Sequence, residues 1–222
     1  MKNLKFLNTV SGWAILFSFC FTGCISLSTH QTGRTNGEGI TTVHGSYNLG
    51  LIQEEQIIGV NTQNESVHLV GLGLVQGMTE RFDAGFNLNS AGNVQFLGKY
   101  QLAGNQTSKL ASSVGADVGF SSMALLFGIV NYNASFISFN SFHPDHNVAI
   151  TFSPRYSYLS AADGWRDAEL VNDYNHLFGY SAGVMVGDRH RFSFEISQFT
   201  GDGRLMGQRP LFSIAYIMRI QE

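Results

Sequence analysis

Two histidines and an aspartate stand close together in His143-Pro144-Asp145-His146, the densest polar cluster of the sequence. Imidazole nitrogens and a carboxylate can bind a transition metal. A Pro-Asp pair is also typical of a tight turn, and a turn between two strands would leave both histidines in water. Because the turn explains the spacing on its own, we predict no metal site here and no cofactor.

A second cluster, between His190 and Glu195, contains a base, a nucleophile and an acid, the residue types that activate a serine for acyl transfer. In an extended strand His190 and Ser193 point to opposite faces, because successive side chains alternate. Ser193 and Glu195 share a face, but the base is missing from it. The spacing therefore predicts a turn followed by a strand, and we assign no catalytic residue.

The N-terminus has the layout of a secretory signal. Lys2 and Lys5 precede an apolar run over residues 13–21, and small residues come before Cys24. The run of about ten residues is too short to cross a bilayer core of about 30 Å as a helix. The chain has only two cysteines, and Cys20 would leave with the signal, so we expect no disulfide in the mature chain.

Phe21-Thr22-Gly23-Cys24 resembles the lipobox of bacterial lipoproteins, although Phe stands where Leu is usual. The resemblance implies a lipoprotein signal peptide over residues 1–23 and lipidation of Cys24 by diacylglycerol and palmitate. Membrane lipid, reached through the acylated Cys24, is thus an expected partner. Ile25 in place of Asp favours sorting to the outer membrane. We expect residues 24–42 to be the lipidated N-terminus and a polar tether.

The amino-acid composition favours a membrane β-protein over a soluble domain or a nucleic-acid-binding protein. Charged residues are 13% of the chain, about half the usual share for soluble domains, and there are 18 Phe and 25 Gly. Such a chain suits strands that meet lipid on one side. Without residues 1–23, eleven basic residues oppose sixteen acidic ones, a net charge of −5. A nucleic-acid binder is more often basic, so we expect no nucleic-acid partner.

Short runs of alternating apolar and polar residues recur from about Val43 to the C-terminus, which is typical of β-strands. Residues 82–88, for example, place Phe and Leu on one face and Asp83 and Asn87 on the other. Ten strands are predicted, many about ten residues long, the length that a tilted strand needs to cross a membrane.

Short and long connections tend to alternate between these strands. With an even number of strands, the start of the first strand and the end of the last strand both lie on the periplasmic side, where we expect the Cys24 lipid. The long loops then lie outside the cell. Two connections break this pattern: Ser121-Ser122 is short for an outer loop, and residues 140–147 are long for an inner turn.

The stretch Gly77-Met78-Thr79-Glu80-Arg81-Phe82-Asp83-Ala84-Gly85-Phe86 resembles an inner-turn hairpin of many bacterial outer-membrane β-barrel proteins. Those often read Gly-[Leu/Val]-Thr-[Asp/Glu]-Arg-[Phe/Leu]-[Asp/Glu]-x-Gly, followed by a strand with a pair such as Lys99-Tyr100. The last strand is similar to a degenerate β-signal, with Ala215 where Gly is usual. The resemblance covers roughly residues 65–220 and implies a fold and a location, not an activity.

We therefore predict an all-β fold: one antiparallel up-and-down barrel of eight to ten strands over residues 43–222, transmembrane and lipid-anchored in the bacterial outer membrane. Charged residues on the polar faces should point into the lumen and pair with one another, because unpaired buried charge is costly. These residues are Asp83, Lys99, Asp117, Arg155, Arg191, Glu195 and Arg219.

Three functions stay open. The first is a lipid-anchored outer-membrane barrel with a structural or binding role and no catalytic activity. The second is a membrane-tethered periplasmic lipocalin-like barrel that binds an apolar ligand, with its Phe-rich faces turned inward. The third is an outer-membrane lipid-modifying enzyme similar to the deacylases that use His, Ser and an acid. The direction of the Phe-rich faces separates the first two.

Overall fold

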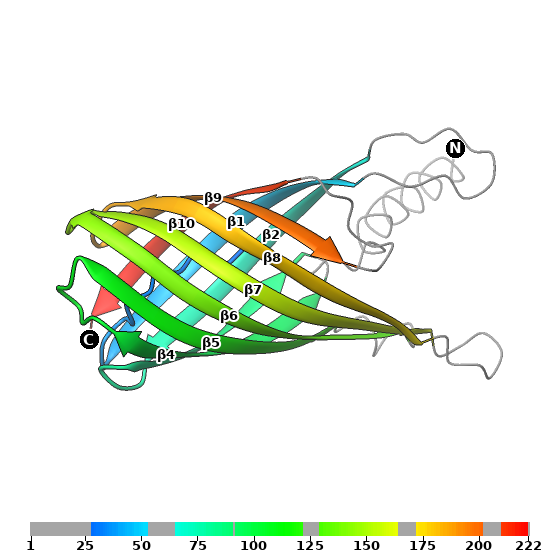
Figure 1. Ribbon diagram of the computed structural model, residues 1–222, viewed down its shortest axis with the longest axis horizontal. Helices are drawn as coiled ribbons and strands as arrows, with labels where there is room; N and C mark the ends of the chain where they lie inside the picture. Colours follow the sequence, from blue (N-terminus) through cyan, green and yellow to red (C-terminus); the bar gives the residue numbers. More distant parts are fainter. Residues whose placement is uncertain are drawn as a thin grey trace, which may run out of the picture.

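The alternating runs of the sequence pair into a sheet that closes on itself. The computed structural model describes residues 28–52, 65–90, 92–121, 129–163, 172–201 and 210–221. Within these ranges ten antiparallel strands follow one another around a barrel, and β1 bonds to β10 (Figure 1). The strands are β1 (Ile40–Ile52), β2 (Glu65–Gly77), β3 (Phe82–Asn89), β4 (Asn93–Ala103), β5 (Leu110–Ser121), β6 (Ile129–Asp145), β7 (Val148–Asp163), β8 (Asn172–Val186), β9 (His190–Gly201) and β10 (Leu211–Gln221). The predicted all-β up-and-down barrel is confirmed.

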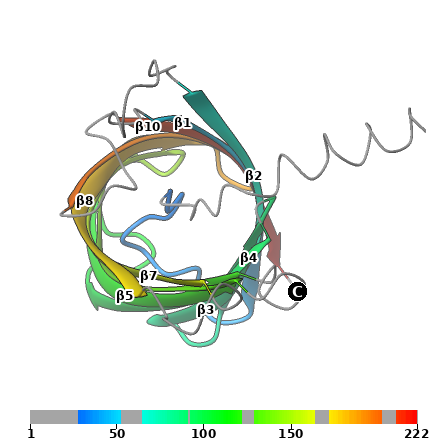
Figure 2. The same ribbon diagram turned by 90° about the vertical axis from the view of Figure 1, so that its right-hand side faces the viewer.

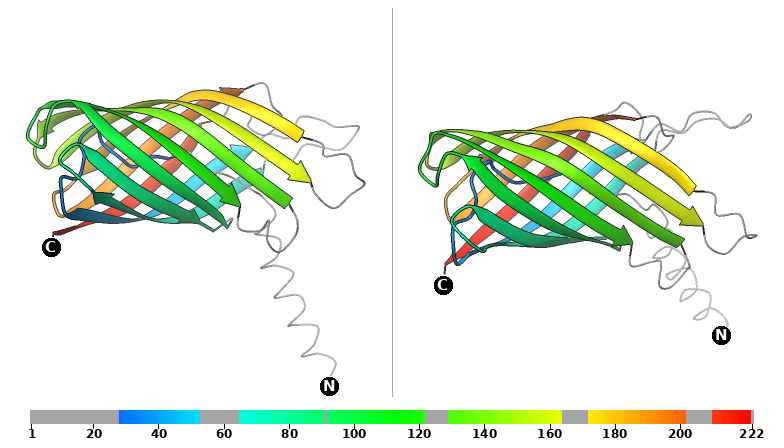
Figure 3. Two further views of the ribbon diagram at one scale, coloured as in Figure 1. Left: turned by 90° about the horizontal axis from the view of Figure 1, so that it is seen from below. Right: turned by 60° about the horizontal axis from the view of Figure 1, so that its bottom comes forward.

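Short connections gather at one end of the barrel, which we call the turn end. Four connections join strands there: residues 78–81, 104–109, 146–147 and 187–189 (Figure 3). Ile40 pairs with Gln221 at the same end. The opposite end is called the loop end. In an outer-membrane barrel the short turns face the periplasm. No helix among the described residues is long and apolar enough to cross a membrane.

The two connections that were expected to break the alternation do not break it. β6 continues to Asp145, which pairs with Val148, so the predicted long connection is a turn of two residues. The register of β6 shifts between Phe142 and Asp145, and this irregularity interrupts the alternation that marks a strand. Between β5 and β6 lie residues 122–128, instead of the predicted short link at Ser121-Ser122.

Large apolar side chains cover the outside of the ring. On β4, Phe96 and Tyr100 are 51% and 48% exposed, whereas Gln95 and Lys99 are buried inside. Every strand has an exposed apolar or aromatic side chain, for example Tyr47, Val70, Phe86, Phe96, Val118, Phe136, Phe152, Phe178, Phe194 and Ile214. Exposing this surface to water would be unfavourable by ~25 cal/mol per Å². The Phe-rich faces therefore point outward, as in a membrane barrel and unlike a periplasmic lipocalin-like barrel.

The chain before β1 lies inside the ring. Residues 28–39, which we call the lumen segment, run through the interior, as the blue trace in Figure 2 shows. They fall in the range predicted as a polar tether, and β1 begins at Ile40 instead of Val43. Several polar residues of this segment, among them Thr29, Thr35 and Asn36, bond to the polar inner wall, which replaces water for them. Cys24 and the signal lie outside the described residues.

Candidate functional site: the lumen segment and its wall

The lumen segment descends from the middle of the barrel to the turn end. Ser28 Oγ donates a hydrogen bond of 2.6 Å to Asn48 Oδ1, eight residues along β1 from Ile40. At the other end Gly39 N donates to the carbonyl of Gly77, the last residue of β2, at 3.0 Å. The chain thus travels toward the turn end and then reverses to form β1.

Glu195 on β9 holds the upper part of the segment. Its Oε1 accepts a hydrogen bond from Thr29 N at 2.9 Å, and its Oε2 accepts from His30 N and Thr29 Oγ1, both at 3.0 Å. All three residues are buried. A carboxylate makes stronger hydrogen bonds than a neutral acceptor. Glu195 therefore anchors the backbone of the segment and, within the described residues, makes no ion pair.

His30 is fixed from both sides of its ring. Nδ1 lies 3.1 Å from Ser193 Oγ, and Nε2 lies 2.6 Å from Ser213 Oγ. The backbone of His30 has φ 45°, the left-handed region that residues other than glycine adopt infrequently. The hydrogen bonds of ring and backbone together stabilise this conformation.

A histidine therefore lies beside Ser193, but it is His30 and not His190. The imidazole of His190 is exposed on the outside and pairs with the hydroxyl of Tyr216 at 2.6 Å. Glu195 bonds to the backbone of the segment and not to the imidazole of His30. The three groups thus do not form an acid–base–nucleophile relay, and they are buried inside the barrel, away from its lipid-facing surface. Sequence alternation could not find His30, because the residue precedes the first strand.

Gly33 lies directly against the wall of the barrel. Its N–H donates to Ser141 Oγ at 3.0 Å, and its carbonyl accepts from Ser113 Oγ at 2.5 Å. A Cβ at this position would lie 2.2 Å from the carbonyl oxygen of Ala111 and 2.9 Å from that of Phe139. Only glycine leaves room for the backbone to lie against β5 and β6.

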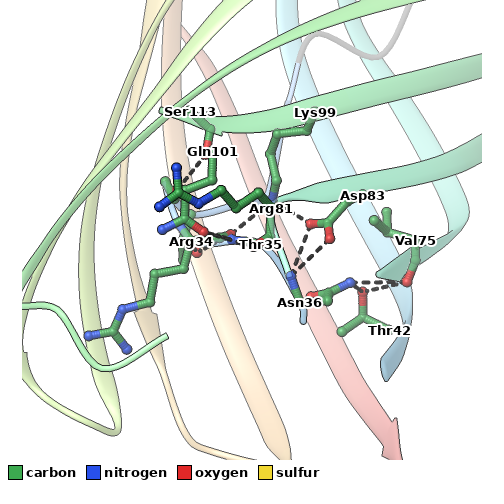
Figure 4. Close-up of polar contacts among 12 residues, drawn as sticks. Arg34, Thr35, Asn36, Thr42, Val75, Arg81, Asp83, Lys99, Gln101 and Ser113 are labelled. Atoms are coloured by element: carbon green, nitrogen blue, oxygen red, sulfur yellow. Dashed lines mark hydrogen bonds and ion pairs between the residues drawn. The ribbon is translucent and has the colours of Figure 1, made fainter. Parts of the chain in front are cut away.

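The lower part of the segment is held by several strands at once (Figure 4). Asn36 N donates to both carboxylate oxygens of Asp83 at 3.0 Å, and Thr35 N donates to Gln101 Oε1 at 2.9 Å. Lys99 Nζ forms an ion pair with Asp83 at 3.0 Å and donates to the carbonyl of Arg34 at 3.0 Å. The Asp83–Lys99 pair thus bonds to the N–H of Asn36 and to the carbonyl of Arg34, two residues apart in the segment.

The seven charged residues predicted to face the lumen divide into two groups. Four of them form ion pairs: Asp83 with Lys99, and Asp117 with Arg155 at 2.6 Å. The other three differ from the expected pairing, since Glu195 binds the lumen segment and Arg191 and Arg219 bond to carbonyl groups. The lumen segment supplies the partners of Glu195 and Arg219, and Arg191 bonds to Asp188 in the turn before β9. The strand pattern contains no sign of the segment.

The predicted turn near residue 145 separates its two histidines. His143 is buried, with Nε2 2.9 Å from Ser141 Oγ, whereas His146 is exposed and pairs with Asp145. In the part of the chain that the structure describes, no group of three or more His, Cys, Asp or Glu side chains is arranged to hold a metal ion.

Comparison with known proteins supports the class that the geometry defines. No family model and no curated protein matches the sequence. The structure is similar to an outer-membrane channel from Pseudomonas putida F1, with a TM-score of 0.57, 7% identity, and coverage of 88% of this chain and 100% of the other. It is also similar to the NanC porin (TM-score 0.47, 11% identity, 82% and 99% covered) and to the attachment invasion locus protein Ail of Yersinia pestis (0.39, 8%, 82% and 99%).

At such low identity the likeness shows the fold alone. A closed barrel of ten strands with apolar side chains around its outside and a polar interior is an outer-membrane β-barrel. The chain therefore belongs in the outer membrane.

Proposed function

We propose that this protein is a lipid-anchored outer-membrane channel, without catalytic activity, whose pore is closed by its own lumen segment. The observation that carries the proposal is the spread of the segment's contacts. They reach β1, β9, β6, β4 and β3 through Asn48, Glu195, Ser141, Gln101 and Asp83. The lumen segment, bonded to strands around the ring, occupies the path that a solute would take.

The similar channel from Pseudomonas putida F1 supports the proposal only in that this fold can enclose a pore. A barrel of this size is narrow enough for side chains or one chain segment to fill it. The polar wall favours a movable segment, because water can replace its hydrogen bonds when the segment leaves. An apolar core would not exchange with water in this way.

The lipid anchor at Cys24 is part of the proposal, and the segment restricts where the lipid can be. Cys24 is four residues before Ser28, and an extended chain spans at most ~3.5 Å per residue, about 14 Å in all. Asn48, which bonds to Ser28, is eight residues from Ile40; at ~3.3 Å per residue and a tilt of ~40°, it lies about 20 Å from the turn end.

A thiol within about 14 Å of Ser28 cannot reach the turn end while the segment keeps its place. The loop end of β1, Ile52, is four residues beyond Asn48, or about 10 Å along the axis, and is within reach. We therefore place the proposed lipid at the loop end, in the outer leaflet, instead of the periplasmic side expected from the sequence. Labelling of intact cells at a tag inserted after Cys24 tests this; protection of the tag until the outer membrane is opened argues against it.

Single-channel recording in planar bilayers tests the closure. The wild-type protein should stay closed, and Gly33→Ala should show conductance steps, because the added Cβ meets the Ala111 carbonyl and displaces the segment. Gly45→Ala is the matched control, since its Cβ would be 3.8 Å from its nearest neighbour, Leu72. If Gly33→Ala is as silent as Gly45→Ala, the barrel is not a channel closed by this segment. Steady conductance of the wild type would contradict the closure.

A further inference from the structure

A cavity of about 140 Å³ lies at the turn end, between the lumen segment and the wall. Three arginines line it: Arg34 from the segment, Arg191 from β9 and Arg219 from β10. Asp188, which is exposed on the turn between β8 and β9, is the single acidic residue among its described lining. The cavity therefore has an excess of positive charge.

The three guanidinium groups have only neutral partners. Arg34 Nε and Nη2 donate to the carbonyl of Ser108 at 3.2 and 2.5 Å. Arg191 Nε donates to the backbone carbonyl of Asp188 at 2.8 Å, and Arg219 Nη2 to that of Asn36 at 3.2 Å. No carboxylate of the described residues forms an ion pair with any of the three.

One buried donor in this group has no partner. Arg219 Nε is shielded from solvent and makes no hydrogen bond within the described residues. Buried donors are nearly always satisfied, so an exception needs an explanation. A guanidinium has five N–H donors in a fixed planar fork, and three such groups offer more donors than the nearby carbonyls accept.

We propose that this cavity binds a small oxyanion of the phosphate class between Arg34, Arg191 and Arg219. A phosphate group has several acceptor oxygens at tetrahedral angles, which matches guanidinium groups arriving from three chain segments. The volume suits a group of few heavy atoms. Because Arg34 belongs to the segment and the other two belong to the wall, the bound anion joins the segment to the barrel. The proposed anion site does not depend on whether the barrel is a channel.

Titration calorimetry of the full-length protein in detergent micelles, with inorganic phosphate at constant ionic strength set by sodium chloride, tests the proposal. We expect one saturable site, and Arg219→Gln should weaken phosphate binding about tenfold through loss of charge-assisted hydrogen bonds. Arg34→Gln, which changes the segment and leaves the strands intact, should have a similar effect. Arg189→Gln is the matched control, because Arg189 is exposed on the same turn as Asp188 and does not line the cavity.

A heat-dependent gel shift verifies that each variant is folded. Wild-type protein that gives no saturable heat beyond a chloride titration overturns the proposal, as does equal phosphate affinity of the wild type, Arg34→Gln and Arg219→Gln. A competition arm with short-chain phosphatidic acid identifies the source of the anion. Displacement of phosphate by this lipid indicates a headgroup of the periplasmic leaflet, and no displacement indicates a free anion; both results support the site.

Discussion

The two halves of the lumen hold the same segment by different means. Toward the loop end, one carboxylate, Glu195, accepts three hydrogen bonds from Thr29 and His30. Toward the turn end, Asp83 has the cation Lys99 beside it, and the backbone of Arg34, Thr35 and Asn36 bonds to Lys99, Gln101 and Asp83. The backbone N–H groups of Thr29 and His30 both bond to one residue, Glu195, whereas the backbone bonds of the lower part are shared among three residues.

The upper part of the segment should open first. Loss of the Glu195 carboxylate removes the acceptor of both backbone N–H groups of Thr29 and His30, and side-chain contacts of Ser28 and His30 remain there. The lower part is bonded to an ion pair that also stabilises the wall. Within the described residues, Glu195 forms no ion pair, and it accepts one further hydrogen bond, from Ser197 Oγ at 3.3 Å, so water can replace its bonds to the segment once water enters. A segment attached in this way can release its upper part while Asn36 stays in place. The following variants test that asymmetry.

Lys99→Met should have the largest effect. Asp83 and Lys99 are 0% and 3% exposed, and removing one partner of a buried ion pair typically costs about 3–5 kcal/mol. We expect a lower urea midpoint in the gel-shift assay, together with faster hydrogen exchange at Asn36. Arg155→Met is the matched control, because it breaks the buried pair with Asp117, which makes no hydrogen bond to the segment. It should lower the midpoint without changing exchange at Asn36; equal exchange in both variants would contradict a role for Lys99 in holding the segment.

Glu195→Ala should free the upper half and leave the barrel intact. Three hydrogen bonds at about 1 kcal/mol each correspond to roughly 100-fold faster exchange at the amides of Thr29 and His30. Glu195→Gln, which keeps one carbonyl acceptor, should fall between this variant and the wild type. Exchange at Thr35 and Asn36 should hardly change. Equal acceleration at both ends would show that the segment moves as one unit and that the two halves are not independent.

The strands could be predicted from the sequence because each one alternates over about ten residues, and side-chain parity alone places Asp83 and Asp117 on the same wall as their partners Lys99 and Arg155. The lumen segment could not. Its residues have no periodicity, and its bonds join positions as distant as Thr29 and Glu195, 166 residues apart. A polar stretch before a barrel looks the same whether water or a polar wall surrounds it. Only the closed ring, which forms from all ten strands, distinguishes the two.

Ser213→Ala should have the smallest effect on hydrogen exchange of the segment. It tests how much the His30 ring contributes to the upper attachment. The hydroxyl of Ser213 lies 2.6 Å from His30 Nε2 and donates to Asn48 Oδ1 at 2.6 Å, so its loss removes about 0.5–1.5 kcal/mol. Exchange at the His30 amide should rise by up to about tenfold, less than in Glu195→Ala. Ser181→Ala is the control, since the buried Ser181 hydroxyl contacts Ser197 and not the segment. A larger effect of Ser213→Ala than of Glu195→Ala would show that the main upper attachment is the imidazole of His30 and not the carboxylate of Glu195.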